Sequence, residues 1–221
     1  MQTQTLSGRE AAIATQDAIE IGGVSFRGVR MRYERNEEIF GQDEPAEYCF
    51  RVLSGAVRTM RFSADGRRQI LGFHMAGDIF GLELGDVYAL TAEAVGACEV
   101  VMVRRGGIDK AASEDANVAR ALLQLTSAQL AHMRDHALIL GRKGAGERVA
   151  AFLLQLAGRL VTTRELDLPM SRADIADYLG LTIETVSRAF SEFERNAAIS
   201  LPSSRHVVMR NPVALHELEA A

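Results

Sequence analysis

One segment, residues 171–195, constrains the fold of this 221-residue chain more than any other. Ser171 and Asp174 stand three residues apart, which resembles a capping box and predicts the start of a helix. Gly180 suits the left-handed residue that ends such a helix, and Thr182 suits the N-cap of a second one. Two short helices joined by a glycine-containing turn predict a helix-turn-helix.

The helical repeat of about 100° per residue assigns two faces to each of these helices. The expected inner faces carry Ile175, Tyr178 and Leu179 in the first helix, and Val186, Phe190 and Phe193, with Ile183 and Ala189, in the second. The opposite face of the second helix carries Glu184, Ser187, Arg188, Ser191 and Arg195. Short hydroxyls between one acid and one arginine are unlike an ordinary solvated face and predict a surface that reads DNA bases.

Three residues of that face have the chemistry needed for base recognition. Arg188 suits bidentate contact with guanine O6 and N7, Glu184 can accept from a cytosine or adenine amino group, and Ser187 can reach a thymine edge. The alternative is a plain ion pair between Glu184 and Arg188, worth only ~0.3–0.5 kcal/mol. The two interpretations are compatible if the ion pair orients Arg188 for base contact.

A wing is predicted after the second helix. Apolar segments 198–201 and 207–210 flank the small, polar and basic loop 202–206, in which His206 is expected to be a wing residue rather than a ligand. Hydroxyls and arginine near the expected interface are candidate contacts with the DNA backbone. These candidates are Ser171, Thr182, Thr185, Ser191, Ser203, Ser204 and Arg205.

Upstream, residues 19–105 read as many short strands separated by glycine, which predicts a β-roll, jelly roll or barrel. The clearest unit is a hairpin in which segments 56–62 and 67–73 flank Asp65-Gly66. Residues 1–17 are polar and suggest a loose arm.

From about residue 113 to residue 140 the apolar period is helical, with two stripes. One stripe holds Val118, Leu122, Leu125, Met133 and Leu140, and a second repeats every seven residues at Leu123, Leu130 and Ala137. We predict a dimerisation helix, with Leu122, Leu125, Met133 and Leu140 as its contact residues. The alternative is that both stripes are buried within one chain.

Three glycines in segment 141–146 predict a domain boundary. The expected α+β architecture therefore has a β domain at 1–112, a dimerisation helix at 113–140 and a winged helix-turn-helix at 141–221. The net charge of −4 argues mildly against nucleic acid, but the excess acid lies upstream. Residues 141–221 hold ten basic and ten acidic residues, so any DNA-binding charge must be concentrated on one face.

Composition excludes several other classes. The cysteines, Cys49 and Cys98, are far apart and are expected to be buried thiols, too few for a four-thiolate iron–sulfur cluster. No metal-ligand spacing, catalytic triad order or phosphate-cradling loop stands out, so no catalytic or metal-binding residue is expected. No signal peptide or membrane span is evident, and a cytoplasmic location is expected.

Nearly the whole chain resembles the CRP/FNR superfamily of bacterial transcription regulators. The segment Glu184-Thr185-Val186-Ser187-Arg188 is similar to the Glu-x-x-Ser-Arg signature of the FNR and FixK branches, and segments 50–58, 66–73 and 77–81 resemble the FixK-type β-roll. The resemblance implies an N-terminal cyclic-nucleotide-binding-like β-roll and a homodimer. It also implies that the protein is a FixK-type activator in nitrogen fixation. Its expected binding partner is double-stranded DNA bearing an inverted repeat of TTGAT-type half-sites. RNA polymerase is the implied partner, touched by the hairpin tip at 63–67.

The departures from the family pattern concern its sensors. Aligned through segment 97–100, Gly81 takes the place of the cassette glycine, Leu82 that of the ribose-binding Glu, and Tyr88 that of the phosphate-binding Arg. A buried phosphate without that arginine is uncompensated charge, so cyclic AMP is not expected to bind. Residues 1–30 also lack the cysteine cluster of FNR. No cofactor is therefore expected.

The competing hypothesis is a ligand sensor whose β-roll holds haem or a metabolite. His74, His132 and His136 are the possible haem ligands, although each is more simply a surface or core residue. An enzyme finds little support, because Asp174 and Asp177 are explained by helix capping and by solvation.

Overall fold

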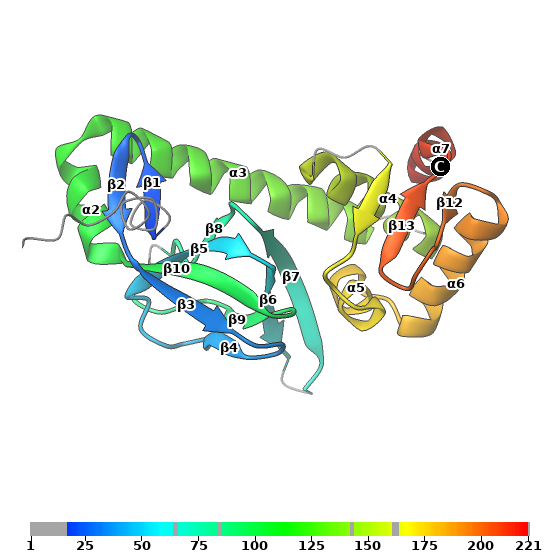
Figure 1. The fold of residues 1–221 in the computed structure, drawn as a ribbon, viewed down its shortest axis with the longest axis horizontal. Helices are drawn as coiled ribbons and strands as arrows, with labels where there is room; N and C mark the ends of the chain where they lie inside the picture. The colour runs from blue at the N-terminus through cyan, green and yellow to red at the C-terminus, as the bar shows by residue number, and fades with distance from the viewer. Residues whose placement is uncertain (1–16, 64–65, 84, 142–143, 161–163, 221) are drawn as a thin grey trace, which may run out of the picture. The chain divides into compact units, whose positions relative to one another are not determined.

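The structure is a computed structural model, and it describes residues 17–63, 66–83, 85–141, 144–160 and 164–220 (Figure 1). The chain forms two compact units. Unit 1 holds the residues up to Thr59 and Phe73–Leu130, and unit 2 holds Met60–Gly72 and Ala131–Ala221. The loose arm expected at 1–17 lies almost wholly outside the described residues. The domain limits at residues 112 and 140 remain predictions.

The predicted β-roll is confirmed. Two four-stranded sheets are ordered β3-β10-β5-β8 and β4-β9-β6-β7, and β1 and β2 form a separate two-stranded sheet. The strands are β1 (Ala18–Ile21), β2 (Val24–Arg27), β3 (Val29–Tyr33), β4 (Glu38–Phe40), β5 (Tyr48–Ser54), β6 (Ala56–Phe62), β7 (Arg68–Met75), β8 (Ile79–Phe80), β9 (Thr91–Ala94) and β10 (Cys98–Arg104). Together with the helices that follow, they confirm the α+β class.

The hairpin predicted around Asp65-Gly66 is formed by β6 and β7. The Ser63 N–H donates to the Arg67 carbonyl at 2.9 Å, and the Gly66 N–H donates to the Ser63 carbonyl at 2.8 Å. Gly66 has a φ of 78°, in the left-handed region that this turn requires. Residues 64 and 65 of the tip, the expected polymerase contact, lie outside the described residues.

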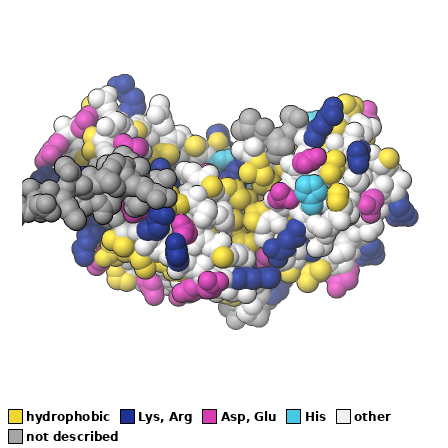
Figure 2. Space-filling view, viewed as in Figure 1, with side chains coloured by type: hydrophobic (Ala, Val, Ile, Leu, Met, Phe, Trp, Pro, Cys, Tyr) yellow, Lys and Arg dark blue, Asp and Glu magenta, His cyan; other side chains and the backbone are white. Residues whose placement is uncertain are grey.

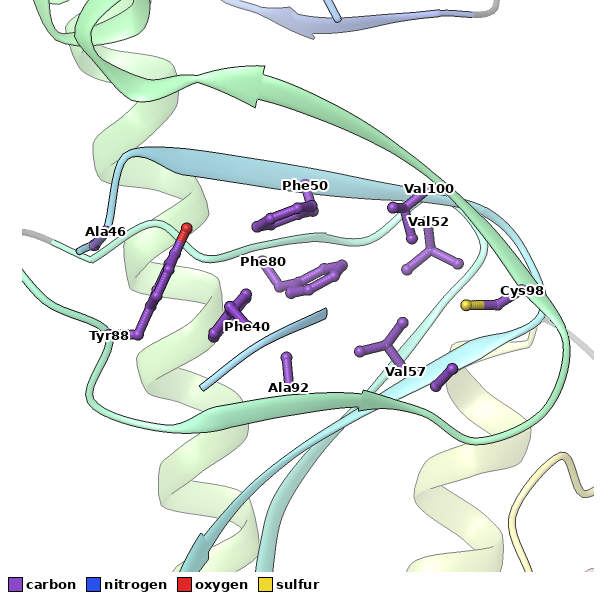
Figure 3. Packing of buried hydrophobic residues seen from close by; sticks show 11 residues of the cluster. Phe40, Ala46, Phe50, Val52, Val57, Phe80, Tyr88, Ala92, Cys98 and Val100 are labelled. Carbon is purple, nitrogen blue, oxygen red and sulfur yellow. The ribbon is translucent and has the colours of Figure 1, made fainter. Parts of the chain in front are cut away.

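Aromatic side chains fill the inside of the β-roll (Figure 3). The rings of Phe40 and Tyr88 stack with centroids 3.7 Å apart, and those of Phe50 and Phe80 with centroids 5.2 Å apart. Both cysteines are buried with free thiols, as expected, and burial raises the pKa of Cys49 to about 12 and of Cys98 to about 11.

Two helices follow the β-roll, not one. α2 (Arg105–Glu114) begins eight residues before the predicted helix start, and α3 (Ala116–Gly141) is a single uninterrupted helix of 26 residues (Figure 1). Leu122 and Leu125 are half-buried and pack against the buried cluster around Val118, and their contact with a second copy stays a prediction. Leu140 is half-buried, and its Cδ2 lies 3.8 Å from where a Cβ on Gly180 would stand. The large apolar residues that α3 leaves exposed are Leu123, Leu130, Met133 and Leu138.

Unit 2 contains the predicted helix-turn-helix and wing. Its further elements are α4 (Ala145–Arg159), β11 (Glu165–Asp167), α5 (Arg172–Leu179), α6 (Ile183–Arg195), β12 (Ile199–Ser200), β13 (His206–Met209) and α7 (Pro212–Ala220). The wing is a three-stranded sheet ordered β11-β13-β12, so β11 adds a strand that was not predicted. Within the part of the chain that is described, no helix combines the length and hydropathy needed to cross a membrane.

Candidate nucleic-acid interface

Side chains and one glycine define the ends of the two helices as predicted. The Ser171 hydroxyl accepts from the Asp174 N–H at 3.2 Å, and the Asp174 carboxylate accepts from the Ser171 N–H at 2.9 Å, which completes the capping box. Gly180 ends α5 at φ 62°, ψ 41°, in the left-handed region. The Thr182 hydroxyl accepts from the Thr185 N–H at 3.2 Å and so caps α6. All three predictions are confirmed.

The faces of α6 are also as expected, with one exception. Val186, Ala189, Phe190 and Phe193 are buried against the rest of unit 2. The residues exposed on the opposite face are Glu184, Ser187, Arg188, Ser191 and Arg195. Ile183, expected on the inner face, is 48% exposed because it is the first residue of α6, where the helix begins beyond the packed core.

Glu184 and Arg188 are the charged side chains near the N-terminal end of the exposed face, and both are ionised at neutral pH. The pKa of Glu184 is lowered, first by hydrogen bonding to its own backbone N–H, then by the Thr182 side chain, and only weakly by Arg188. Arg188 reaches the Thr185 hydroxyl at 3.5 Å. The ionised Glu184 and the guanidinium of Arg188 therefore lie exposed near the N-terminal end of α6.

Arg172 is a residue of this interface that the sequence patterns missed. Its guanidinium carbon lies 3.3 Å from the centre of the Phe190 ring, so α5 contacts α6 through a cation–π interaction. Burial lowers the pKa of Arg172 to about 10. A cation at the first position of a helix is unfavourable beside the helix dipole, so Arg172 could have been singled out in the sequence as a residue with a specific contact.

The wing presents Ser204 and Arg205 as exposed side chains, as required for contact with a DNA backbone. The Arg205 Nη1 donates to the Pro169 carbonyl at 3.4 Å. Ser203 has a local role, because its hydroxyl accepts from the backbone N–H groups of Arg205 and His206 at 3.3 and 3.0 Å. His206 lies 2.7 Å from an Asp167 carboxylate oxygen, within the wing sheet as predicted.

One prediction for α5 is wrong. Asp177 was expected to be merely solvated, but its Oδ2 accepts from the Arg68 Nε at 2.8 Å. The partner comes from a segment 109 residues away, which local patterns cannot reveal.

Of the three histidines proposed as haem ligands, two contact other side chains of the protein and one lies on the surface. The Nε2 of His74 lies 3.1 Å from the Thr59 hydroxyl, His136 is stacked on Tyr178, and His132 is exposed. Among the described residues, no group of three or more His, Cys, Asp or Glu side chains could hold a metal ion.

Acidic and basic side chains are interspersed on the face of the molecule shown in Figure 2, and they do not form a continuous basic patch there.

Known proteins resemble the chain along most of its length. Residues 30–115 match the model of the cyclic nucleotide-binding domain, and residues 147–218 match that of the Crp-like helix-turn-helix domain. The nitrogen fixation regulation protein FixK of Azorhizobium caulinodans is 48% identical over 202 residues, covering 89% of this chain and 82% of that protein. FixK of Rhizobium meliloti is 38% identical, covering 94% and 98%.

A solved structure has a similar fold and sequence. The structure of FixK2 from Bradyrhizobium japonicum has a TM-score of 0.85 and 49% identity, covering 88% of this chain and 98% of that one. The wing, the two capped helices and the matches above support DNA binding through the helix-turn-helix. The chain belongs to the CRP/FNR family of transcription regulators and is of the FixK type.

Proposed function

We propose that the protein is a dimeric, sequence-specific transcription activator that binds an inverted repeat of TTGAT-type half-sites without a small-molecule effector. The observation that carries the proposal is the split of α6 into a face with buried Val186, Phe190 and Phe193 and an exposed face with Glu184, Ser187 and Arg188. The family resemblance alone supports two further parts of the proposal. One is contact with RNA polymerase through the hairpin tip at 63–67, and the other is a cytoplasmic location.

Base reading would rest on the N-terminal half of α6. Arg188 suits bidentate hydrogen bonds to guanine, and the ionised Glu184 suits an amino group of cytosine or adenine. Ser187 suits a thymine edge, and the exposed Ile183 adds an apolar group for a thymine methyl. These four groups match a half-site that mixes A·T and G·C pairs.

Backbone contacts would surround these residues. The exposed side chains of Ser191, Ser204 and Arg205 are available for phosphates. Thr182 and Thr185 lie at the start of α6, where backbone N–H groups and the helix dipole favour an anion. Ser171 is less suited, because its hydroxyl donates to the Asp174 carboxylate, which already occupies the start of α5. Ser203 is less suited, since its hydroxyl already organises the wing loop.

A second copy of the chain would pack along α3. Leu123, Leu130, Met133 and Leu138 are each 56% to 67% exposed, and Leu123 and Leu130 are seven residues apart. This is the spacing of a seam between two helices. Of the residues first expected in the dimer contact, Met133 fits this seam, whereas Leu122 and Leu125 pack on the β-roll.

The inside of the β-roll supports effector independence. Tyr88, at the position of the family's phosphate-binding arginine, is 2% exposed, and its hydroxyl donates to the Tyr48 carbonyl at 2.7 Å. A tyrosine side chain has no cationic form, so it cannot compensate a phosphate as arginine does, and burial, the largest influence, raises the pKa of Tyr88 to about 12 and keeps its hydroxyl neutral. The Phe40 ring lies against Tyr88 (Figure 3), and Leu82 packs against the cluster around Ile19.

The alternative is a CRP-like sensor that uses the β-roll to hold haem or a metabolite. Its simplest test is the visible spectrum of the protein after incubation with haem and removal of the excess. A strong absorption band that disappears on replacing His74 would favour the sensor.

The proposal is tested by measuring the affinity of two variants for an inverted-repeat duplex and for the same duplex with single base-pair changes. We expect Arg188→Ala to lose roughly 1–3 kcal/mol at the G·C pair of the half-site and little at a duplex already changed there. Arg205→Ala should weaken all duplexes equally and flatten the salt dependence by about one unit. Uniform weakening by Arg188→Ala would contradict the base-reading role.

A further inference from the structure

The first helix of the helix-turn-helix, α5, has only eight residues, and two neighbouring residues of β7 bind both of its ends. At its start, Asp174 is 3% exposed, and its Oδ2 accepts from the Ser171 backbone and hydroxyl. Its other oxygen, Oδ1, accepts from the Arg68 Nη2 at 2.9 Å. Arg68 therefore compensates the buried carboxylate of the capping box.

The same guanidinium also binds the next turn of α5. The Arg68 Nε donates to the Asp177 carboxylate at 2.8 Å, so one arginine bridges two carboxylates that are three residues apart. The Arg68 side chain is 24% exposed and those of Asp174 and Asp177 are 4% and 32% exposed, so solvent screens the ion pairs only in part.

Gln69 acts at the opposite end of the helix. The last carbonyls of a helix lack intrahelical partners, and α5 has its left-handed Gly180 directly after them. The Gln69 Nε2 donates to the Asp177 carbonyl at 2.7 Å, and the His136 Nε2 lies 2.7 Å from the Tyr178 carbonyl. The Arg148 Nη1 donates to the Leu179 carbonyl at 3.2 Å. Side chains from three other segments thus satisfy the end of α5.

We propose that Arg68 and Gln69 are positioning residues for DNA recognition. They fix the orientation of α5, and α5 in turn supports α6 through Phe190 under Arg172 and through the turn at Gly180. The base-reading side chains of α6 are held at the correct angle only while this support is in place. This inference rests on the proposed function, because it concerns the same interface.

The test compares Arg68→Gln with Arg61→Gln, a change at an exposed arginine of the preceding strand, β6. Affinities are measured for the inverted repeat and for a scrambled duplex of equal length and composition. We expect Arg68→Gln to bind the repeat about 3- to 10-fold more weakly, with less than about a twofold change for the scrambled duplex and an unchanged salt slope. Arg61→Gln should leave the ratio of the two affinities as in the wild type.

Three further variants separate positioning from a general loss of stability. Asp177→Asn should reproduce part of the effect, because it weakens one of the two carboxylate contacts of Arg68, and the double variant should be no worse than Arg68→Gln alone. Arg68→Lys, which retains the charge but not the fork, should recover part of the specificity. Without DNA, amide exchange in the peptide 172–181 should be faster in Arg68→Gln but not in Arg61→Gln.

Three results would overturn the inference. One is an Arg68→Gln protein that matches Arg61→Gln in specificity. Another is equal weakening on both duplexes with a salt slope reduced by about one unit, which would make Arg68 a direct phosphate contact. The third is a lowered melting temperature with normal affinity of the folded fraction. If the wild type does not prefer the repeat, the proposed function fails, and unchanged amide exchange in Arg68→Gln would still overturn the positioning role.

Discussion

The turn residue Gly180 allows a stability prediction in which two effects can be separated. A Cβ at Gly180 would have the Leu140 Cδ2 at 3.8 Å and the Arg148 Nη1 at 3.9 Å as nearest neighbours, both ordinary contact distances. Gly180→Ala therefore meets no clash, and its cost is that of placing an L-residue at φ 62°. That conformation costs roughly 1–2 kcal/mol, of which the stiffer unfolded chain offsets about 0.4–1 kcal/mol.

We expect Gly180→Ala to lower the free energy of unfolding by about 1 kcal/mol. Urea unfolding followed by circular dichroism measures it, with an unchanged slope as the sign that only stability has altered. The matched control is Gly158→Ala in α4, an exposed helical position with no positive φ and open space around it. It should stabilise the protein by roughly 0.5–1 kcal/mol. Equal effects of the two changes would refute the reasoning from backbone conformation.

Two other predictions concern α3. Leu130→Asp should give a monomer in sedimentation at micromolar concentration, whereas Gln124→Asp, also exposed on α3, should not; a dimeric Leu130→Asp protein would contradict the proposed seam. Burial lowers the pKa of His136, so the unfolded chain takes up the proton first, and stability should fall as the pH drops below about 6.5. His136→Phe should have a melting temperature less dependent on pH between about 7.5 and 5.5, and a steeper dependence would refute this assignment.

The sequence allowed the helix-turn-helix to be predicted in detail because its determinants are local. The partners in each cap, such as Ser171 with Asp174 and Thr182 with Thr185, lie within a turn of each other. The hairpin around Gly66 was predictable for the same reason. These contacts are fixed by spacing and by backbone preference, which a single sequence displays.

Contacts between distant segments were not predictable in this way. Both stripes of α3 have helical spacing, so periodicity alone could not decide that Leu122 and Leu125 pack on the β-roll while Leu123 stays exposed. Nor did any local pattern link Arg68 to Asp177. The remaining parts of the candidate site depend on which segments the fold brings together.

The binding of the α5 carbonyls also has a consequence for dissecting the protein. A fragment beginning at the glycine-rich segment 141–146 would retain the wing and both helices of the motif, but it would lack Gln69 and His136. The carbonyls of Asp177 and Tyr178 would lose these donors, and Asp174 would lose its arginine. We therefore expect a truncation made at the glycines to hold α5 less firmly than the whole chain does.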